Sequence, residues 1–155
     1  MNSKFTFAIM AMLAIFLASC NDDSDNNGSV TVSGTLMKGP PDPNTMVKGY
    51  IQNSVGEYTE LVIQTKTTDY AGSFTANVEV ANLGPTLLRS DPAQFWDEIS
   101  GLQLGGLQLE TMVDTSISTD IGFGVCGHLT TRRIQTLMGT MSFTDAKAQA
   151  ESELL

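Results

Sequence analysis

Between Val30 and about Ser90, apolar and polar residues alternate in short runs that are separated by turn-forming residues. The clearest run covers 73–80, in which every even-numbered residue is apolar and every odd-numbered residue is polar. Successive side chains of a strand point to opposite faces, so this run places one face in a core and the other in water. Further strands are predicted at 45–52, 60–68 and 83–88. Short strands at this spacing favour a mainly β fold, an antiparallel β-sandwich, over a parallel α/β fold.

Two loops in this part of the chain carry strong turn chemistry. The first runs from Gly39 to Asn44 and contains three prolines, which have no amide proton to donate to a sheet. The second runs from Thr68 to Gly72. There the Asp69 carboxylate can accept hydrogen bonds from the backbone ahead of it, and Gly72 can adopt a positive φ. The sequence therefore predicts tight reversals at both loops.

Three segments occur in a characteristic order: Val32–Pro40, Val47–Tyr50 and Thr67–Phe74. Together they resemble the carboxypeptidase regulatory-like domain, a transthyretin-like β-sandwich found on many exported bacterial proteins. That family has a glycine-rich first strand, a second strand ending in an aromatic residue, and a hairpin of the form TTD-x-x-G-x-F. The matching residues serve folding, so the resemblance implies an accessory, non-catalytic module that needs no cofactor.

The N-terminal residues have the pattern of an export signal. A positively charged start that includes Lys4 precedes an apolar run from Phe5 to Ala18, which is 14 residues long and broken only by Thr6. This length suits the apolar region of a signal peptide and is shorter than the roughly 20 residues that a membrane-spanning helix needs. Residues 1–19 are therefore predicted to be a cleaved signal peptide.

The end of that signal, Leu17-Ala18-Ser19-Cys20, resembles the lipobox of bacterial lipoproteins. The resemblance implies that signal peptidase recognises Leu17, Ala18 and Ser19 and that Cys20 carries the lipid. Several acyl chains on one cysteine would anchor the mature protein stably, because a single chain binds a bilayer only marginally. The membrane is thus the first expected partner.

Residues 20–29 are predicted to be the lipidated cysteine and a solvated acidic tether, since 21–29 contain no hydrophobic residue. An acidic stretch behind the cysteine resembles signals that send some lipoproteins to the outer face of the outer membrane. Asn21 departs from the aspartate of the inner-membrane retention signal. Asp23, Asp25 and Asn27 match the first half of a calcium loop, but Gly34 stands where its bidentate glutamate should be. We therefore expect an envelope protein anchored in the outer membrane, either exposed at the surface or facing the periplasm, and no metal site.

The remaining chain is predicted to continue the sandwich domain of residues 30–90 with additional strands in 91–128 and a helical tail in 129–155. Two alternating runs around Gly105-Gly106 predict a hairpin with a primed turn there. A further strand is expected at 117–125, and a helix at about 130–138 with a stripe of residues four apart. A capping box opens a second helix whose Ala146, Ala150 and Leu154 share a face. The stripe consists of Leu129, Arg133, Leu137 and Met141, widened by Ile134 and Met138, and the box is Ser142-Phe143-Thr144-Asp145.

This helical run is similar to a short tail found on the same exported lipoproteins, which usually continues further. The chain ends on Leu154-Leu155 with no glycine or polar cap. We expect either a shortened relative of those lipoproteins or a partner that covers this end.

Few residues point to chemistry. The net charge is −9, from 8 basic and 17 acidic residues, which argues against nucleic-acid binding; Arg132-Arg133 is interpreted as a solvated helix face. Two cysteines and one histidine are too few for a structural zinc site. Cys126 and His128 would share a face if they lay on a strand, and Cys126 is expected to be a buried structural thiol. Trp96 is expected to pack in the core or at its rim, beside the solvated Asp97-Glu98 pair.

The resulting hypothesis is a lipid-anchored envelope protein with a non-catalytic β-sandwich that serves as an accessory or binding module. One alternative is a lipoprotein that binds a glycan or a small ligand, for which an exposed Trp96 would be the sign. The other is a thiol enzyme that uses Cys126 and His128. An envelope protein or a glycan is the expected partner, whereas the ligand-binding residues and the oligomeric state are left open.

Overall fold

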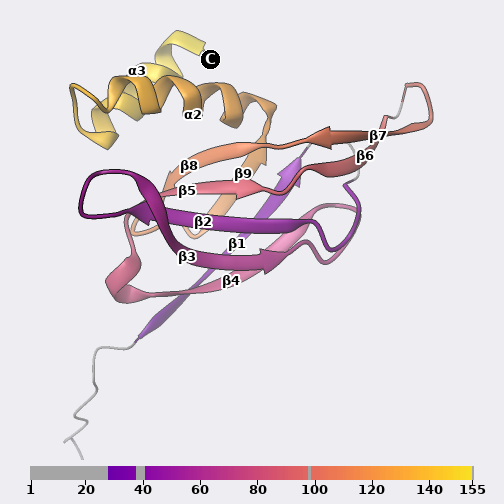
Figure 1. The fold of residues 1–155 in the computed structure, drawn as a ribbon, viewed down its shortest axis with the longest axis horizontal. Coiled ribbons are helices and arrows are strands. Elements are labelled where there is room, and N and C mark those ends of the chain that lie inside the picture. Colours follow the sequence, from indigo (N-terminus) through magenta and orange to yellow (C-terminus); the bar gives the residue numbers. More distant parts are fainter. Residues whose placement is uncertain (1–27, 38–40, 98, 155) are drawn as a thin grey trace, which may run out of the picture.

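The computed structural model describes residues 28–37, 41–97 and 99–154. The signal peptide, Cys20 and almost all of the tether lie outside these residues. The described chain is mainly β, with two helices at its C-terminal end (Figure 1). Its elements are β1 (Ser29–Met37), β2 (Met46–Gln52), β3 (Tyr58–Lys66), β4 (Ser73–Glu79), η1 (Val80–Asn82), β5 (Pro85–Ser90), β6 (Ala93–Asp97), β7 (Leu102–Leu107), β8 (Glu110–Asp114), β9 (Asp120–Gly124), α2 (Val125–Leu137) and α3 (Phe143–Leu154).

Two sheets form the sandwich, and the predicted fold class is confirmed. One sheet has the strand order β4-β1-β9 and the other β3-β2-β5-β8. Only the β1–β9 pair is parallel among the described strand pairs. The alternating side chains of both sheets meet in one apolar core, made by Val32, Leu36, Val47, Ile63, Phe74, Val78, Leu88, Leu109, Ile121 and Phe123.

The turn before β4 has the predicted mechanism. The backbone N–H of Ser73 donates to the Asp69 carboxylate at 2.9 Å, and the N–H of Gly72 donates to the Asp69 carbonyl at 3.1 Å. These backbone donors hold the pKa of Asp69 below its ordinary value, since they favour the charged carboxylate. Gly72 has a φ of +77°. Phe74 follows immediately and is buried in the core.

The hairpin predicted around Gly105-Gly106 is wrong in its position. β7 runs straight through both glycines and pairs with β6, so the reversal lies between Asp97 and Leu102. Ala93 pairs with Leu107 and the next partners are Phe95 and Leu104, which leaves two residues of β7 opposite one residue of β6. This is a β-bulge, and Gly106 takes the positive φ of +85° that such a bulge requires. A Gly-Gly pair between alternating runs is compatible with a hairpin turn or with a β-bulge. The prediction from the sequence was the turn, and the structure has the bulge.

Helix α2 begins five residues earlier than predicted. Its N-cap residue Gly124 offers no side-chain cap, and the first turn contains Val125 and Gly127, which are poor helix formers. Contact with β8 stabilises this turn instead. A Cβ atom at Gly127 would lie 3.1 Å from the Thr111 hydroxyl, a tight contact that glycine avoids where the helix approaches the strand. The strand expected at 117–125 is also shorter, because the turn after β8 extends through Ile117 and α2 begins at Val125, so β9 covers only Asp120–Gly124.

The buried face of α2 also differs from the predicted stripe. Thr130, Thr131, Ile134 and Leu137 are buried, whereas Leu129 is exposed. Ile134 and Leu137 pack with Leu87 and Met112 of the second sheet and with Phe143, Ala146 and Ala150 of α3. The two helices thus cover the outer face of that sheet and make a second, smaller core.

Side chains of α2 close the free edge of β8. The backbone N–H of Glu110 donates to Nδ1 of His128 at 3.1 Å, and that of Met112 donates to Oγ1 of Thr131 at 2.9 Å. Unpaired edge donors of a buried strand would cost free energy, so these two acceptors replace a missing neighbouring strand.

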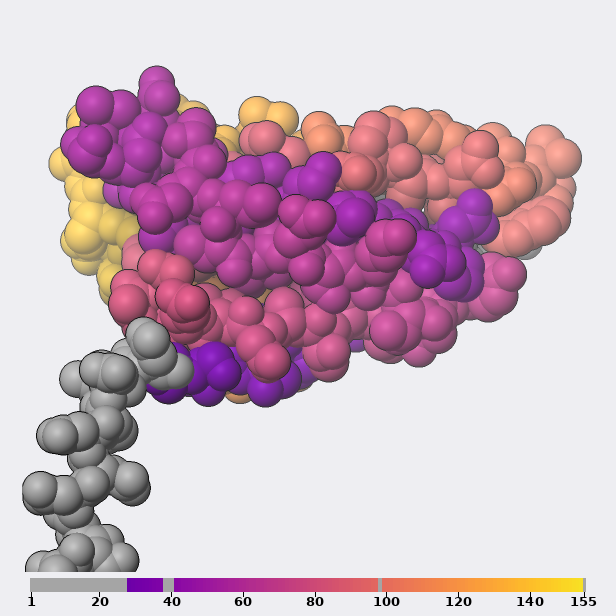
Figure 2. All heavy atoms as spheres, turned by 60° about the horizontal axis from the view of Figure 1, so that its bottom comes forward, coloured from indigo at the N-terminus to yellow at the C-terminus, as the bar shows by residue number. Residues whose placement is uncertain are grey.

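The predicted cap of α3 is confirmed. The N–H of Asp145 donates to Oγ of Ser142 at 3.2 Å, and the same hydroxyl donates to the Asp145 carboxylate at 2.6 Å. Ala146 and Ala150 are buried as expected, while Leu154 is half exposed. Figure 2 shows the helices at one end of the molecule and the β6–β7 hairpin at the other. Within the described part of the chain, no helix is both long enough and apolar enough to cross a bilayer.

The edge contact gives a first prediction. Replacing Thr131 by valine keeps the shape of the side chain but removes the acceptor for the buried N–H of Met112. We expect Thr131→Val to lower the free energy of unfolding by about 1–3 kcal/mol, the cost of an unsatisfied buried donor. Urea unfolding measures this as a lower midpoint with an unchanged slope.

Thr136→Val is the matched control, because Thr136 lies on the same helix and its exposed hydroxyl only donates to the Arg132 carbonyl. We expect its effect to stay within about 0.5 kcal/mol. Equal effects of the two substitutions would contradict the role of Thr131 as an edge acceptor.

Candidate functional site

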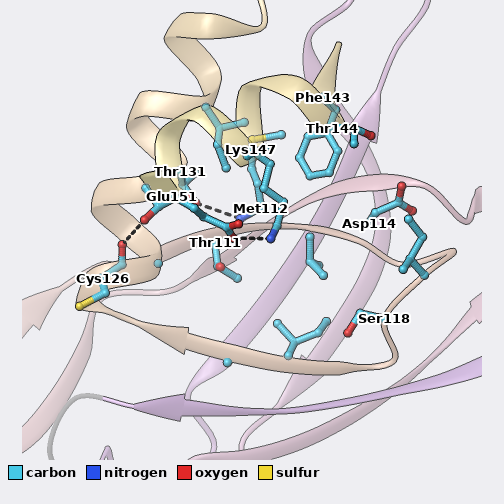
Figure 3. A pocket seen from close by; sticks show the side chains of 18 of the residues that line it. Thr111, Met112, Asp114, Ser118, Cys126, Thr131, Phe143, Thr144, Lys147 and Glu151 are labelled. Carbon is cyan, nitrogen blue, oxygen red and sulfur yellow. Dashed lines mark hydrogen bonds and ion pairs between the residues drawn. The ribbon is translucent and has the colours of Figure 1, made fainter. Parts of the chain in front are cut away.

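A cleft lies between strands β8 and β9 on one side and the two helices on the other (Figure 3). One wall is formed by β8, β9 and the turn that joins them, and the other by α2 and α3. Its volume is about 560 Å³, within the range of pockets that hold small molecules. The residues that line it are 111–114, 117, 118, 120–122, 126, 127, 130, 131, 134, 143, 144, 147, 148 and 151.

The deep part of the cleft is apolar. Met112 of β8, Ile134 of α2 and Phe143 of α3 belong to the second core, and each also lines the cleft. Ile121 of β9 reaches the cleft from the main core. These side chains are fixed by their packing on both sides, so the apolar floor is already formed in the absence of a ligand.

The rim of the cleft is polar and acidic. On the α3 side, Lys147 and Glu151 form an ion pair one helical turn apart. On the sandwich side, the Asp114 carboxylate accepts hydrogen bonds from the backbone and hydroxyl of Ser116. Asp120 lines the cleft as well, and neither aspartate forms an ion pair with a described residue. The rim therefore holds two carboxylates that no described basic side chain neutralises.

The structure does not bring Cys126 and His128 together as a catalytic pair. Both lie on α2, where residues two apart point about 200° away from one another. Cys126 lines the edge of the cleft, as Figure 3 shows, whereas His128 is not part of the lining and accepts the N–H of Glu110. Cys126 is exposed, so the prediction of a buried thiol is wrong. Both errors follow from expecting a strand where the helix begins.

Trp96 lies on the β6–β7 hairpin, which is at the opposite end of the molecule from α3 (Figure 1). Its side chain is about half exposed, which fits a rim position and excludes a core position. Asp97 points to the other face of the hairpin and accepts hydrogen bonds from the Ser100 hydroxyl at 2.6 Å and the Ile99 N–H at 3.2 Å. These hydrogen bonds lower the pKa of Asp97. The Asp97 carboxylate therefore stabilises the turn between β6 and β7. Glu98 lies outside the described residues.

The cleft itself was not predicted from the sequence. The capping box places Phe143 at the start of α3, so the sequence did indicate one residue of the helical wall of the cleft. Met112 and Asp114 lie some thirty residues earlier, and nothing in their local pattern shows that they face α3. Among the described residues, no group of three or more histidine, cysteine or acidic side chains is arranged to hold a metal ion.

Helix α3 is held against α2 by a two-bonded ion pair. Nε of Arg133 donates to Oε2 of Glu153 at 2.6 Å, and Nη2 donates to Oε1 at 3.1 Å. Gln149 donates to the same carboxylate at 2.8 Å. The hydrogen bonds from Arg133, followed by that from Gln149, lower the pKa of Glu153 from 4.5 to about 2.

This pair gives a second prediction. Because the folded pKa of Glu153 is depressed, its contribution to stability is present above pH 4.5 and is lost as the pH falls toward about 2. Arg133→Gln should return the pKa toward 4.5, so that at about pH 3.5 the Glu153 carboxyl is mostly protonated in the variant and mostly ionised in the parent chain. Carbon-detected NMR titration of the carboxyl group measures this. Arg132→Gln, which removes the neighbouring arginine, should leave the pKa of Glu153 low; a shift there would contradict the assignment.

Comparison with protein-family models, with curated proteins and with solved structures gives no match to this chain.

Proposed function

We propose that this chain is a lipid-anchored protein of the bacterial cell envelope, whose β-sandwich is a non-catalytic module that binds a small, mainly apolar ligand in the cleft. The observation that carries the binding role is the preformed apolar floor beneath a polar rim. A cleft of this size with converging polar groups is the usual form of a small-molecule site.

The anchoring part of the proposal is supported by the sequence around Cys20. The apolar run of 14 residues, the small residues Ala18 and Ser19, and the acidic tether occur in the order that a lipoprotein needs. The outer membrane, with the module exposed at the cell surface, is the proposed location. The first described residues enter β1 at one end of the sandwich, where a tether can join without disturbing either sheet.

Membership of the carboxypeptidase regulatory-like family is also a proposal. It is supported by the two-sheet sandwich and by the turn at Asp69–Gly72, whose hydrogen bonds match the role that the motif implies. The non-catalytic character is supported by the separation of Cys126 from His128, and by the use of Asp97 as a turn residue.

The anchoring gives a third prediction. Cells fed a labelled fatty acid should incorporate the label into the parent chain and lose it completely in Cys20→Ala, because the thiol of Cys20 is the proposed acceptor. Cys126→Ala, which removes the only other cysteine, should keep the label. Protease added to intact cells should degrade the labelled protein if it faces outward. Label retained in Cys20→Ala, or lost in Cys126→Ala, would contradict this anchoring.

The cleft gives a fourth prediction. A chain starting at residue 20 with Cys20→Ala should bind octylamine more tightly than 1-octanol, and 1-octanol more tightly than octanoate. The apolar floor takes the common alkyl chain, and the carboxylates of Asp114 and Asp120 favour the cation by about two- to fivefold, as partly exposed charge pairs do. Amide NMR titration measures the affinities and shows whether residues around Thr144 and Ser118 respond.

Ala148→Trp places a large ring in the cleft and should weaken binding of all three probes about tenfold or more. Ser152→Trp is the matched control on the same helix, since Ser152 is exposed and does not line the cleft. Binding that is equally weakened in both variants, or that shifts no cleft amide, would place the ligand elsewhere.

A further inference from the structure

The β6–β7 hairpin projects beyond both sheets (Figures 1 and 2). It carries large apolar side chains that are exposed to solvent. Four of them lie within nine residues of sequence: Trp96 is 46% exposed, Ile99 97%, Leu102 61% and Leu104 42%. Trp96 pairs with Gln103 and so lies on the face opposite to Leu102 and Leu104, which form an exposed apolar pair of the kind that marks interaction surfaces. Neither strand of the hairpin belongs to the two main sheets, although Leu107 at the end of β7 packs against the main core.

One edge of the hairpin is occupied and the other is free. On the outer side of β6, Pro41 forms a bridge with Phe95, and the N–H of Asp42 donates to the Gln94 carbonyl at 3.1 Å. On the outer side of β7, no strand among the described residues pairs with Leu102–Leu107. An unpaired edge presents N–H and C=O groups that can accept one more strand.

The side chains of β7 define which face a further strand would extend. Leu104 pairs with Phe95 and Leu102 pairs with Asp97, so both leucines lie on the same face of the hairpin. Gln103 lies on the other face and donates to the Asp42 carboxylate at 3.1 Å, which holds β7 to the Pro41 loop. A strand added at the free edge would therefore place its own side chains beside the two leucines and bury part of the apolar surface that is now in water.

The charge of the strand indicates what that partner is. The chain as a whole carries a net charge of −9, yet residues 100–109 contain no charged side chain. Two copies of this strand can lie side by side without like charges meeting, whereas most of the remaining surface of two copies would repel. A basic partner would gain nothing from an uncharged strand. The strand is thus complementary to itself, as the shared patch of a two-fold symmetric dimer must be.

We propose that β7 pairs in antiparallel orientation with β7 of a second copy of this chain, giving a continuous four-stranded sheet of two hairpins. Leu102 and Leu104 of both copies lie together on one face of that sheet. The hairpin lies at the end of the sandwich opposite to the start of β1 (Figure 1). Two copies that are anchored in one membrane through Cys20 would hold their hairpins at the same distance from the bilayer, which favours pairing. Only this contribution of the anchor rests on the proposed function.

Disulfide formation between copies tests the pairing in the full chain. Cys126→Ser first removes the exposed thiol, and then Leu102→Cys, Gln103→Cys, Leu104→Cys or Gly105→Cys is introduced singly. The residue on a two-fold axis between antiparallel strands faces its own counterpart, with Cβ atoms about 4.5–5.5 Å apart, close to what a disulfide requires. We expect one of the four positions to give a dimer as the main band on a non-reducing gel, with weaker bands at its neighbours.

Val55→Cys in the same background is the control, since Val55 is 75% exposed in the loop between β2 and β3, at the end away from the hairpin. In the chain that cross-links best, Leu104→Lys places a charged side chain of each copy in the apolar face that the two strands share and should reduce the dimer band at least about fivefold. Leu102→Lys replaces it if position 104 carries the cysteine. Unchanged resistance to protease shows that the sandwich of each variant is folded.

Cross-linking at all four positions no stronger than at Val55→Cys would overturn the proposal and leave the edge to a different protein. Cross-linking that the lysine does not reduce would also overturn it. Cross-linking is compared with Val55→Cys in the cell fraction that contains the chain, whether membrane or soluble. Failure of acylation at Cys20 therefore changes the fraction, whereas failure of β7 to pair removes the dimer band.

Discussion

The contact between α2 and the edge of β8 determines most of what is particular to this molecule. His128 and Thr131 supply the acceptors that a neighbouring strand would otherwise provide, at 3.1 and 2.9 Å from the N–H groups of Glu110 and Met112. Because a buried unsatisfied donor costs about 1–3 kcal/mol, the helix is held in one position along the strand. That position lays Ile134 over the second sheet and leaves the cleft open between the strand and α3.

A charge cluster around a buried carboxylate lies at the same junction. Glu110 is almost fully buried, and its Oε1 accepts a hydrogen bond from Nε of Arg89 at 2.7 Å. Nη2 of Arg132 lies 3.1 Å from Oε2, yet that oxygen accepts no hydrogen bond from a described residue. The second contact is therefore an ion pair without hydrogen-bond alignment, and Arg89 is the stronger partner. Arg89 also stacks over the Tyr50 ring at 5.7 Å, so the cluster joins β2, β5, β8 and α2.

The sequence predicted the parts of this fold that depend on local chemistry. The alternation in 73–80, the turn at Asp69 and the cap at Ser142 were all confirmed, because each depends on residues within one turn or one strand. The buried face of α2 was not predicted, because it contains Thr130 and Thr131. These polar residues are not expected on a buried face unless their contact with the edge of β8 is known. The cleft joins residues some thirty positions apart, and no local pattern encodes such a meeting. The lipid anchor stays a prediction from the sequence.

The position of the hairpin explains why the sandwich tolerates it. The chain leaves β5 after Ser90 and returns to β8 at Glu110, which pairs directly with Arg89, so the insertion does not change the register of the sheet. The N–H of Ser90 donates to the Leu109 carbonyl, and the N–H of Leu109 donates to the Ser90 hydroxyl, both at 3.0 Å, which closes the base of the insertion. Between these two positions the strands of the hairpin belong to neither main sheet, although Leu107 at the end of β7 packs against the main core. Leu102 and Leu104 of β7 stay exposed to solvent and add nothing to the sandwich core, and the proposed contact with a second copy gives these side chains a role.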